Sequence, residues 1–203
     1  MIAIIDYGAG NIKSVINAFK FLDKKCVLVS EPDSLKEHSH IVLPGVGAFG
    51  EAMKKLKMNG MDEAIKEAVK SGKAFIGICL GMQLLFEKSF EFGEHEGLSL
   101  LPGEVVKFDE TKFDRPLKIP HVGWNTLSFK QNSPLRLGLK ELEYLYFVHS
   151  YHVVCDDKFA LAKTGYGYEF TSAVQHENLF GFQPHPEKSH DVGLKILENF
   201  TRL

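Results

Sequence analysis

Short apolar runs alternate with helix-spaced apolar residues along the first half of the chain. The runs that are typical of buried strands cover residues 2–5, 26–29, 41–43 and 74–78. Apolar residues recur every three or four positions over about 12–22, 48–58 and 61–71, and again from Met82. Strands that alternate with helices predict an α/β fold with a mostly parallel sheet and helices on both of its faces.

The second half of the chain has a different pattern. Its apolar segments follow one another without long helical stretches, and several are separated by hairpin-type turns. The expected strands cover residues 104–108, 123–129, 144–155, 159–164, 171–176 and 179–183. One more helix is expected over about 191–201. The whole pattern predicts a single domain over residues 1–203, in which antiparallel strands extend the parallel sheet.

Composition and charge exclude several classes of protein. The 203 residues include 44% hydrophobic and 25% charged residues, which is ordinary for a globular domain, and the formal net charge is −2. Because there is no basic excess to neutralise phosphates, we expect no nucleic-acid partner. No apolar run approaches the roughly 18 residues that a membrane helix needs. The N-terminal residues do not resemble a signal peptide, so we expect a cytoplasmic protein without membrane contact.

The three cysteines are Cys26, Cys79 and Cys155. An odd number at such wide spacing is neither a disulfide framework nor a zinc knuckle, and it fits a reducing compartment. The paired histidines of the sequence lack a third ligand at metal spacing. We therefore expect no metal and no cofactor.

The sharpest local motif is the run Gly77-Ile78-Cys79-Leu80-Gly81 after an expected strand. It is the nucleophile elbow G-x-S-x-G with cysteine in place of serine. A buried cysteine after a strand is often only a core residue, but the flanking glycines permit a tight turn that exposes the thiol. The N-terminus of the helix that is expected to follow would favour the thiolate. The motif therefore predicts that Cys79 is a nucleophile.

A thiol nucleophile needs a base, and His185 is the best candidate among nine histidines. Prolines flank it on both sides and exclude a helix. Glu187 lies two residues further on, so in an extended segment both side chains point to the same side. The carboxylate can then fix the tautomer of the imidazole. His149 is the alternative base, although its place in a long apolar strand favours a structural role.

Two glycine-rich turns follow early strands. The run Pro44-Gly45-Val46-Gly47-Ala48-Phe49 can direct backbone N–H groups at one point, as an oxyanion hole requires, and the amide of Leu80 is the natural second donor. The other turn, at residues 6–11, suggests a phosphate-binding loop. Its third glycine is replaced by Lys13, so the indication of a nucleotide site is weak.

These motifs together resemble the class I, or triad, glutamine amidotransferases over almost the whole chain. Three motifs carry the resemblance: PGVGAF at 44–49, GICLGMQ at 77–83 and QPHPEKS at 183–189. Three more resemble the glutaminase subunits of imidazole glycerol phosphate synthases within that family: IIDYGAGNIKSV at 4–15, PHVGWN at 120–125 and YFVHSY at 146–151. The sequence departs from many relatives at Pro184, where they carry an aromatic residue.

The resemblance implies a flavodoxin-like sheet and assigns roles to particular residues. The implied catalytic triad is Cys79, His185 and Glu187, and the implied oxyanion hole is formed by Gly45, Val46 and Gly47 with Leu80. The implied glutamine-binding residues are Gln83, Glu91, Ser150 and Tyr151. The implied partner-facing residues are Asn11, Pro120, Trp124 and Lys188.

The resemblance also implies a reaction and a partner. The chain would hydrolyse L-glutamine through a Cys79 thioester and pass the ammonia to a (β/α)8-barrel cyclase of histidine biosynthesis in a heterodimer. Three alternatives share the fold: a cysteine hydrolase that acts alone, a subunit that feeds ammonia to another acceptor such as a sugar nucleotide, and an inactive binding module. The motifs at 120–125 and 146–151 argue against the first, and the intact triad argues against the third.

Overall fold

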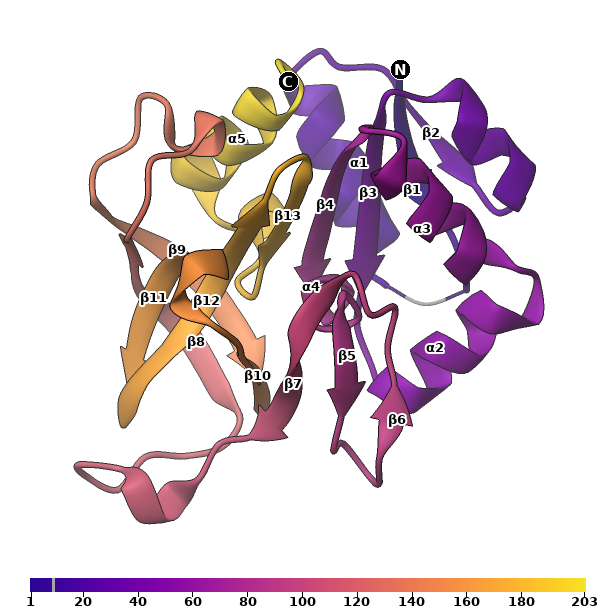
Figure 1. The fold of residues 1–203 in the computed structure, drawn as a ribbon. Helices are drawn as coiled ribbons and strands as arrows, with labels where there is room; N and C mark the ends of the chain where they lie inside the picture. The colour runs from indigo at the N-terminus through magenta and orange to yellow at the C-terminus, as the bar shows by residue number, and fades with distance from the viewer. Residues whose placement is uncertain (9) are drawn as a thin grey trace.

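One β-sheet connects the two halves of the molecule, and helices lie against both of its faces (Figure 1). The computed structural model describes residues 1–8 and 10–203. The possible phosphate loop at 6–11 includes Ala9, so that prediction lies partly outside the described residues. Within the described part of the chain, no helix is long and apolar enough to cross a bilayer.

Five adjacent strands form the parallel part of the sheet. Their order is β2 (Cys26–Val29), β1 (Ile2–Ile5), β3 (His40–Gly45), β4 (Ala74–Cys79) and β13 (Leu179–Phe182), and each pairs in parallel with its neighbour. Every residue of β1, β4 and β13 is buried, which explains why these strands read as continuous apolar runs. The predicted α/β fold class is confirmed.

Two hydrophobic cores cover the two faces of this parallel part. Successive residues of β1 point to opposite sides, so that Ile4 packs in one core and Ile5 in the other. Helices α1 (Ile12–Phe21) and α5 (His190–Phe200) cover the face of Ile4. Helices α2 (Phe49–Met58) and α3 (Met61–Lys70) cover the face of Ile5 (Figure 1).

The other strands extend the sheet from β13. The continuous path runs through β12 (Tyr168–His176), β10 (Tyr151–Val154), β7 (Leu101–Lys107), β5 (Phe86–Ser89) and β6 (His95–Glu96). A branch leaves β12 through β11 (Ala160–Tyr166), β8 (His121–Phe129) and β9 (Leu142–His149). All pairs in this extension are antiparallel except β5 with β7. Short 3-10 turns are found at Pro32–Glu37, Glu110–Lys112, Pro134–Arg136, Asp157–Phe159 and Pro186–Lys188.

Two segments differ most from the sequence prediction, beside the short unexpected strand β6 and the earlier starts of β7 and β12. The helix expected from Met82 is a single turn, α4 (Leu80–Gln83), and the chain returns to a strand at Phe86. Residues 82–86 are all buried, so this segment has no polar face on which an amphipathic helix could continue. The strand expected over 144–155 is interrupted at Ser150, between β9 and β10.

Candidate active site

The candidate nucleophile, Cys79, is the last residue of β4 and has a strained backbone. Its φ of 56° and ψ of −113° lie outside the regions that an L-residue prefers. Non-glycine residues keep such angles only where the surrounding structure holds them, and such residues gather at active sites. The strain turns the chain sharply between β4 and α4, as the elbow motif predicts.

The elbow requires glycine at positions 77 and 81 because a side chain would not fit there, not because the backbone is left-handed. Neither Gly77 nor Gly81 has a φ in the left-handed region. A Cβ atom on Gly81 would collide with the carbonyl oxygen of Leu43, and one on Gly77 would collide with the carbonyl group of Gly81. The glycines therefore allow α4 to pack closely on β3 and β4. Because α4 has only one turn, its dipole is smaller than that of the longer helix that the sequence predicted after Cys79.

His185 and Glu187 form a buried ion pair behind the nucleophile. Nδ1 of His185 donates a hydrogen bond of 2.8 Å to Oε1 of Glu187, and the two side chains are 2% and 1% exposed. Two further bonds hold the loop: the His185 amide donates to the carbonyl of Tyr146, and the Ser189 hydroxyl donates to the carbonyl of His185. Glu187 thereby fixes the tautomer, so that Nε2 is the nitrogen left for chemistry.

The electrostatic environment of His185 favours its protonated form. Burial alone lowers its pKa, but the adjacent Cys79 sulfur and the Glu187 carboxylate outweigh it and raise the pKa to about 10. Among the described residues, the buried Nε2 atom has no hydrogen-bond partner. An imidazolium beside the sulfur is the arrangement that stabilises a thiolate.

His149, the alternative base, has both ring nitrogens engaged. Nδ1 donates to the carbonyl of Tyr151 at 2.8 Å, and Nε2 lies 3.0 Å from Nδ1 of His121. Burial, as the main cause, lowers the pKa of His149 to about 3. A neutral ring with two occupied nitrogens cannot take the thiol proton, so the geometry favours His185 as the base.

One cavity of about 260 Å³ lies over Cys79 and His185. It brings together most of the residues that the sequence assigned to the site, although they come from five separate segments of the chain. The lining residues are Val46, Gly47, Cys79, Leu80, Gln83, Glu91, Val148, His149, Ser150, Tyr151 and His185. Gly45 does not line the cavity, but it pairs with Cys79 at the adjacent carboxyl ends of β3 and β4.

Tyr7, a residue that the sequence analysis did not assign, contacts the candidate oxyanion turn through a hydrogen bond. The Tyr7 hydroxyl donates a hydrogen bond of 3.1 Å to the carbonyl of Pro44. A Cβ atom on Gly45 would lie 2.9 Å from that hydroxyl and 2.8 Å from the Gly81 amide nitrogen, so only glycine fits there. Burial, and then the charge of Cys79, raise the pKa of Tyr7, which keeps it a neutral donor.

Glu91 lines the cavity and also anchors the helix after the oxyanion turn. Its Oε2 accepts a hydrogen bond of 2.6 Å from the backbone amide of Phe49, the first residue of α2. A carboxylate at this helix terminus is electrostatically favourable. The position of Glu91 therefore has a structural explanation beside the predicted one in substrate binding.

A second residue that the sequence analysis did not assign is Gln183. Its side chain is fully buried and connects Gln83 to the sulfur of Cys79 through hydrogen bonds. The only signal in the sequence was its place in the motif at 183–189, where it precedes the histidine by two residues.

Two of the predicted partner-facing residues, Trp124 and Lys188, lie close together in the structure. The ring of Trp124 is 48% exposed and stacks on His190 at 5.1 Å, and it meets the ring of Tyr146 at 6.3 Å. The Lys188 ammonium lies 6.0 Å from the centre of the Tyr146 ring. The structure thus brings Trp124 and Lys188 to one surface around Tyr146. Pro120 immediately precedes β8, the strand that carries Trp124, and Asn11 precedes α1.

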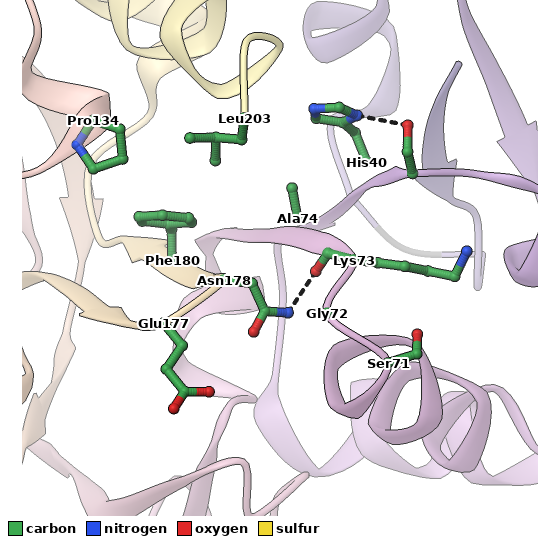
Figure 2. Close-up of a pocket in the computed structure, with 11 residues that line it drawn as sticks. His40, Ser71, Gly72, Lys73, Ala74, Pro134, Glu177, Asn178, Phe180 and Leu203 are labelled. Carbon is green, nitrogen blue, oxygen red and sulfur yellow. Dashed lines mark hydrogen bonds between the residues drawn. The ribbon is translucent and has the colours of Figure 1, made fainter.

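A larger cavity, of about 610 Å³, lies at the opposite end of the parallel strands (Figure 2). It is lined by the first residues of β3 and β4, His40 and Ala74, and by the turn that contains Asn178. Figure 2 shows Asn178 donating a hydrogen bond to the carbonyl of Lys73. The Ser39 hydroxyl lies 2.8 Å from Nδ1 of His40. The Ser39–His40 contact lacks a third group: Nε2 of His40 has no hydrogen-bond partner among the described residues, whereas Glu187 orients the ring of His185. This cavity is therefore not the candidate site.

No group of three or more histidine, cysteine or carboxylate side chains within residues 1–8 and 10–203 is arranged to hold a metal ion.

Comparisons with known proteins show which family the chain resembles. The family described as "Glutamine amidotransferase class-I" matches residues 3–203. The imidazole glycerol phosphate synthase subunit HisH of Sulfurimonas denitrificans is 60% identical over 203 residues, which are 100% of this chain and 98% of that protein. The HisH subunit of Wolinella succinogenes is 53% identical over 204 residues, and the match covers 100% of both chains.

Solved structures with low identity support the fold. The structure of PurLQS from Thermotoga maritima superposes with a TM-score of 0.77 at 21% identity and covers 99% of this chain and 97% of that one. A crystal structure of a glutamine amidotransferase gives a TM-score of 0.75 at 19% identity, with 99% and 100% covered. The chain therefore belongs to the class I glutamine amidotransferase family, on the branch that contains the HisH subunits of imidazole glycerol phosphate synthases.

Proposed function

We propose that the chain hydrolyses the side-chain amide of L-glutamine and delivers the ammonia to a cyclase partner in imidazole glycerol phosphate synthesis. The observation that carries this proposal is the convergence of a strained Cys79, a buried His185–Glu187 pair and Glu91 on one cavity. Pockets that bind drug-sized ligands have volumes of ~300–1,000 Å³. The cavity over Cys79, of about 260 Å³, is smaller and suits a single amino acid.

The first chemical step is attack by sulfur on the carboxamide. His185 takes the thiol proton at Nε2, and the Cys79 thiolate forms a bond to the side-chain carbonyl carbon of glutamine. The resulting oxyanion is stabilised by backbone donors of the turn at Gly45, Val46 and Gly47, together with the amide of Leu80. Val46, Gly47 and Leu80 already line the cavity beside the sulfur.

The second step releases ammonia and the third releases glutamate. As the tetrahedral intermediate collapses, the C–N bond breaks and His185 gives its proton to the leaving nitrogen. His185 then takes a proton from water, whose oxygen attacks the γ-glutamyl thioester. The C–S bond breaks, the sulfur recovers its proton from His185, and glutamate leaves. Glu187 stabilises the imidazolium in each of these transfers.

The rest of the cavity suits the amino-acid part of glutamine. The Glu91 carboxylate offers a charge partner to the α-ammonium group, while Gln83, Ser150 and Tyr151 surround the remainder of the molecule. Glu91 can do this while its Oε2 keeps the bond to Phe49, since a carboxylate has two oxygens.

An exposed apolar surface on β8 and β9 is the proposed docking site for the cyclase. Val122 pairs with Val148, and Trp124 pairs with Tyr146, across the two strands. The exposed fractions of Val122, Trp124 and Val148 are 56%, 48% and 36%. Contiguous exposed apolar residues of this kind mark interaction surfaces.

This surface also suggests a route for ammonia. Val148 belongs both to the surface and to the lining of the cavity. A partner docked there would cover the mouth of the site, so ammonia could leave without protonation in bulk water. We propose that this partner is a (β/α)8 barrel, that Asn11, Pro120, Trp124 and Lys188 face it, and that the pair acts in the cytoplasm.

The experiment is a glutaminase assay of the purified chain alone and with its cyclase partner captured from native lysate. We expect slow hydrolysis by the isolated chain and a rise of about a hundredfold or more when the partner and its ligand complete the oxyanion turn. Full turnover by the chain alone would contradict the proposed control by the partner. Capture of a synthase that aminates another acceptor, such as a sugar nucleotide, would contradict the proposed pathway.

A further inference from the structure

A chain of hydrogen bonds between buried side-chain amides ends on the sulfur of Cys79. Nε2 of Gln83 donates to the carbonyl of Tyr151 at 3.0 Å and to Oε1 of Gln183 at 2.9 Å. Nε2 of Gln183 lies 3.8 Å from Sγ of Cys79. Gln183 is fully buried and Gln83 is 6% exposed, so the chain is screened from water.

The backbone carbonyl of Tyr151 determines the direction of this chain. A carbonyl oxygen can only accept, so the amide nitrogen of Gln83, not its oxygen, must face it. Gln83 then offers its second N–H to Gln183, whose oxygen accepts it. His149 Nδ1 donates to the same Tyr151 carbonyl at 2.8 Å and reinforces its role as acceptor. The only amide group of Gln183 left to face the sulfur is therefore its N–H donor.

A donor in this position matches a thiolate better than a thiol. A thiolate only accepts hydrogen bonds, and bonds to ionised groups are stronger than neutral ones. In the thiol form, the S–H group has a distant acceptor, the carbonyl of Val148 at 4.0 Å. A buried N–H without a good acceptor is costly, so the Gln183 amide gains most when the sulfur carries a negative charge.

We propose that Gln183 stabilises the Cys79 thiolate by donating a hydrogen bond to it, and that Gln83 orients Gln183 for this purpose. The inference rests on the proposed function, in which Cys79 is the nucleophile. Gln183 touches the reacting atom, whereas Gln83 acts through it as a positioning residue. The pair partly replaces the stabilisation that a longer helix after Cys79 would supply.

The test uses the full chain and measures the alkylation of Cys79 by iodoacetamide, with mass spectrometry of the peptide that contains Cys79. In Gln183→Met, which keeps the volume and removes the donor, we expect the rate constant at pH 7 to fall about ten- to a hundredfold, the range for a hydrogen bond to a charged group. In the complex with the cyclase, kcat for glutamine should fall by a similar factor while KM changes little.

A double-mutant cycle tests the role of Gln83. Gln83→Met should also slow the alkylation, but it should add little in the Gln183→Met background, because both changes interrupt the same chain. The matched control is Asn199→Leu, which removes another buried amide, bonded to the carbonyls of Leu135 and Leu137 far along the chain from Cys79. It should lower the melting temperature and leave the alkylation rate unchanged.

Three results would overturn the inference: unchanged alkylation in a folded Gln183→Met variant, additive effects of the two glutamine substitutions, or an equal loss in Asn199→Leu. Gln183→Met is folded if its near-ultraviolet circular dichroism spectrum is native. If it is not folded, the Gln83→Met variant serves as the test. An alkylation rate of Gln83→Met equal to that of the unsubstituted chain then refutes the inference. Fast alkylation that depends on Gln183 in a chain without glutaminase activity would support the inference and refute the proposed function.

Discussion

The imidazole of His185 donates a hydrogen bond of 2.8 Å to the carboxylate of Glu187, although both side chains are almost completely buried. Burying a charged pair is unfavourable unless the partners satisfy each other. Here Pro186 separates the two residues and begins a 3-10 turn, so the local chain presents both side chains together. The pair therefore offers a preorganised proton acceptor whose second nitrogen is available to Cys79.

The Glu187→Gln variant tests this pair directly. The carboxylate is one of the causes that raise the pKa of His185, so its loss should lower that pKa and weaken the imidazolium. We expect kcat for glutamine to fall by about a hundredfold or more, the usual range for general acid–base catalysis. Titration of the His185 ring by NMR should show the lower pKa. An unchanged titration with unchanged kcat would show that Glu187 does not act on the base.

The Tyr7→Phe variant tests the support of the oxyanion turn. Removal of the hydroxyl deletes the hydrogen bond from Tyr7 to the Pro44 carbonyl. Pro44, which precedes Gly45, is then held less firmly. We expect about 1 kcal/mol lower stability and a decrease in kcat with little change in KM, because the turn acts on the transition state. Urea denaturation and steady-state kinetics of the complex measure both. A variant with wild-type kcat would restrict Tyr7 to a role in packing.

Two substitutions of Glu91 separate its contacts. Glu91→Gln keeps an oxygen that can accept from the Phe49 amide but removes the charge for the substrate ammonium. It should raise KM for glutamine about tenfold and leave stability nearly unchanged. Glu91→Ala should raise KM similarly and also lower stability by about 1 kcal/mol, because α2 loses its terminal acceptor. If KM stays unchanged in both variants, Glu91 only anchors α2.

The buried histidines next to the site predict acid sensitivity. Burial lowers the pKa of His121 to about 4 and, as the main cause, that of His149 to about 3, from an ordinary value of 6.5. The unfolded chain therefore binds protons first as the pH falls. The stability present above pH 6.5 is lost progressively down to about pH 4 for His121 and about pH 3 for His149. The loss from His121 is about 3 kcal/mol.

Urea denaturation of the unsubstituted chain and of His121→Phe at pH 8 and pH 4.5 measures this effect. The variant is expected to be less stable at pH 8, because the Nε2 atom of His149 loses its partner, and to depend less on pH. Equal pH dependence in the two proteins would show that His121 is not a source of the acid sensitivity.

The parallel part of the fold could be predicted from the sequence because its strands are continuous apolar runs, and β1, β4 and β13 are buried on both faces. Residues 2–5 and 26–29 match β1 and β2 at both ends, and 74–78 falls one residue short of β4. The segment after the elbow could not be predicted in the same way. Leu84, Leu85 and Phe86 fit a helix or a strand equally by composition; in the folded chain Leu84 and Leu85 form a turn and Phe86 begins β5.

The residues of the candidate site were predictable where a local motif carries the chemistry, as at Cys79, His185 and Glu187. Tyr7 and Gln183 were not, because their roles depend on contacts across 37 and 104 residues of sequence. The tight turn at Cys79 was implied by the elbow motif, but the need for Gly81 arises from its closeness to Leu43, which only the packed sheet shows.

The most direct test of the account is the identification of the residue that a glutamine-like electrophile modifies. The complex is incubated with a γ-chloroketone analogue of glutamine, and the peptides are analysed by mass spectrometry. The account predicts an adduct on Cys79 alone, protection by glutamine, and no adduct in Cys79→Ala. Modification of Cys26 or Cys155 in place of Cys79, or retention of glutaminase activity by Cys79→Ala, would contradict it.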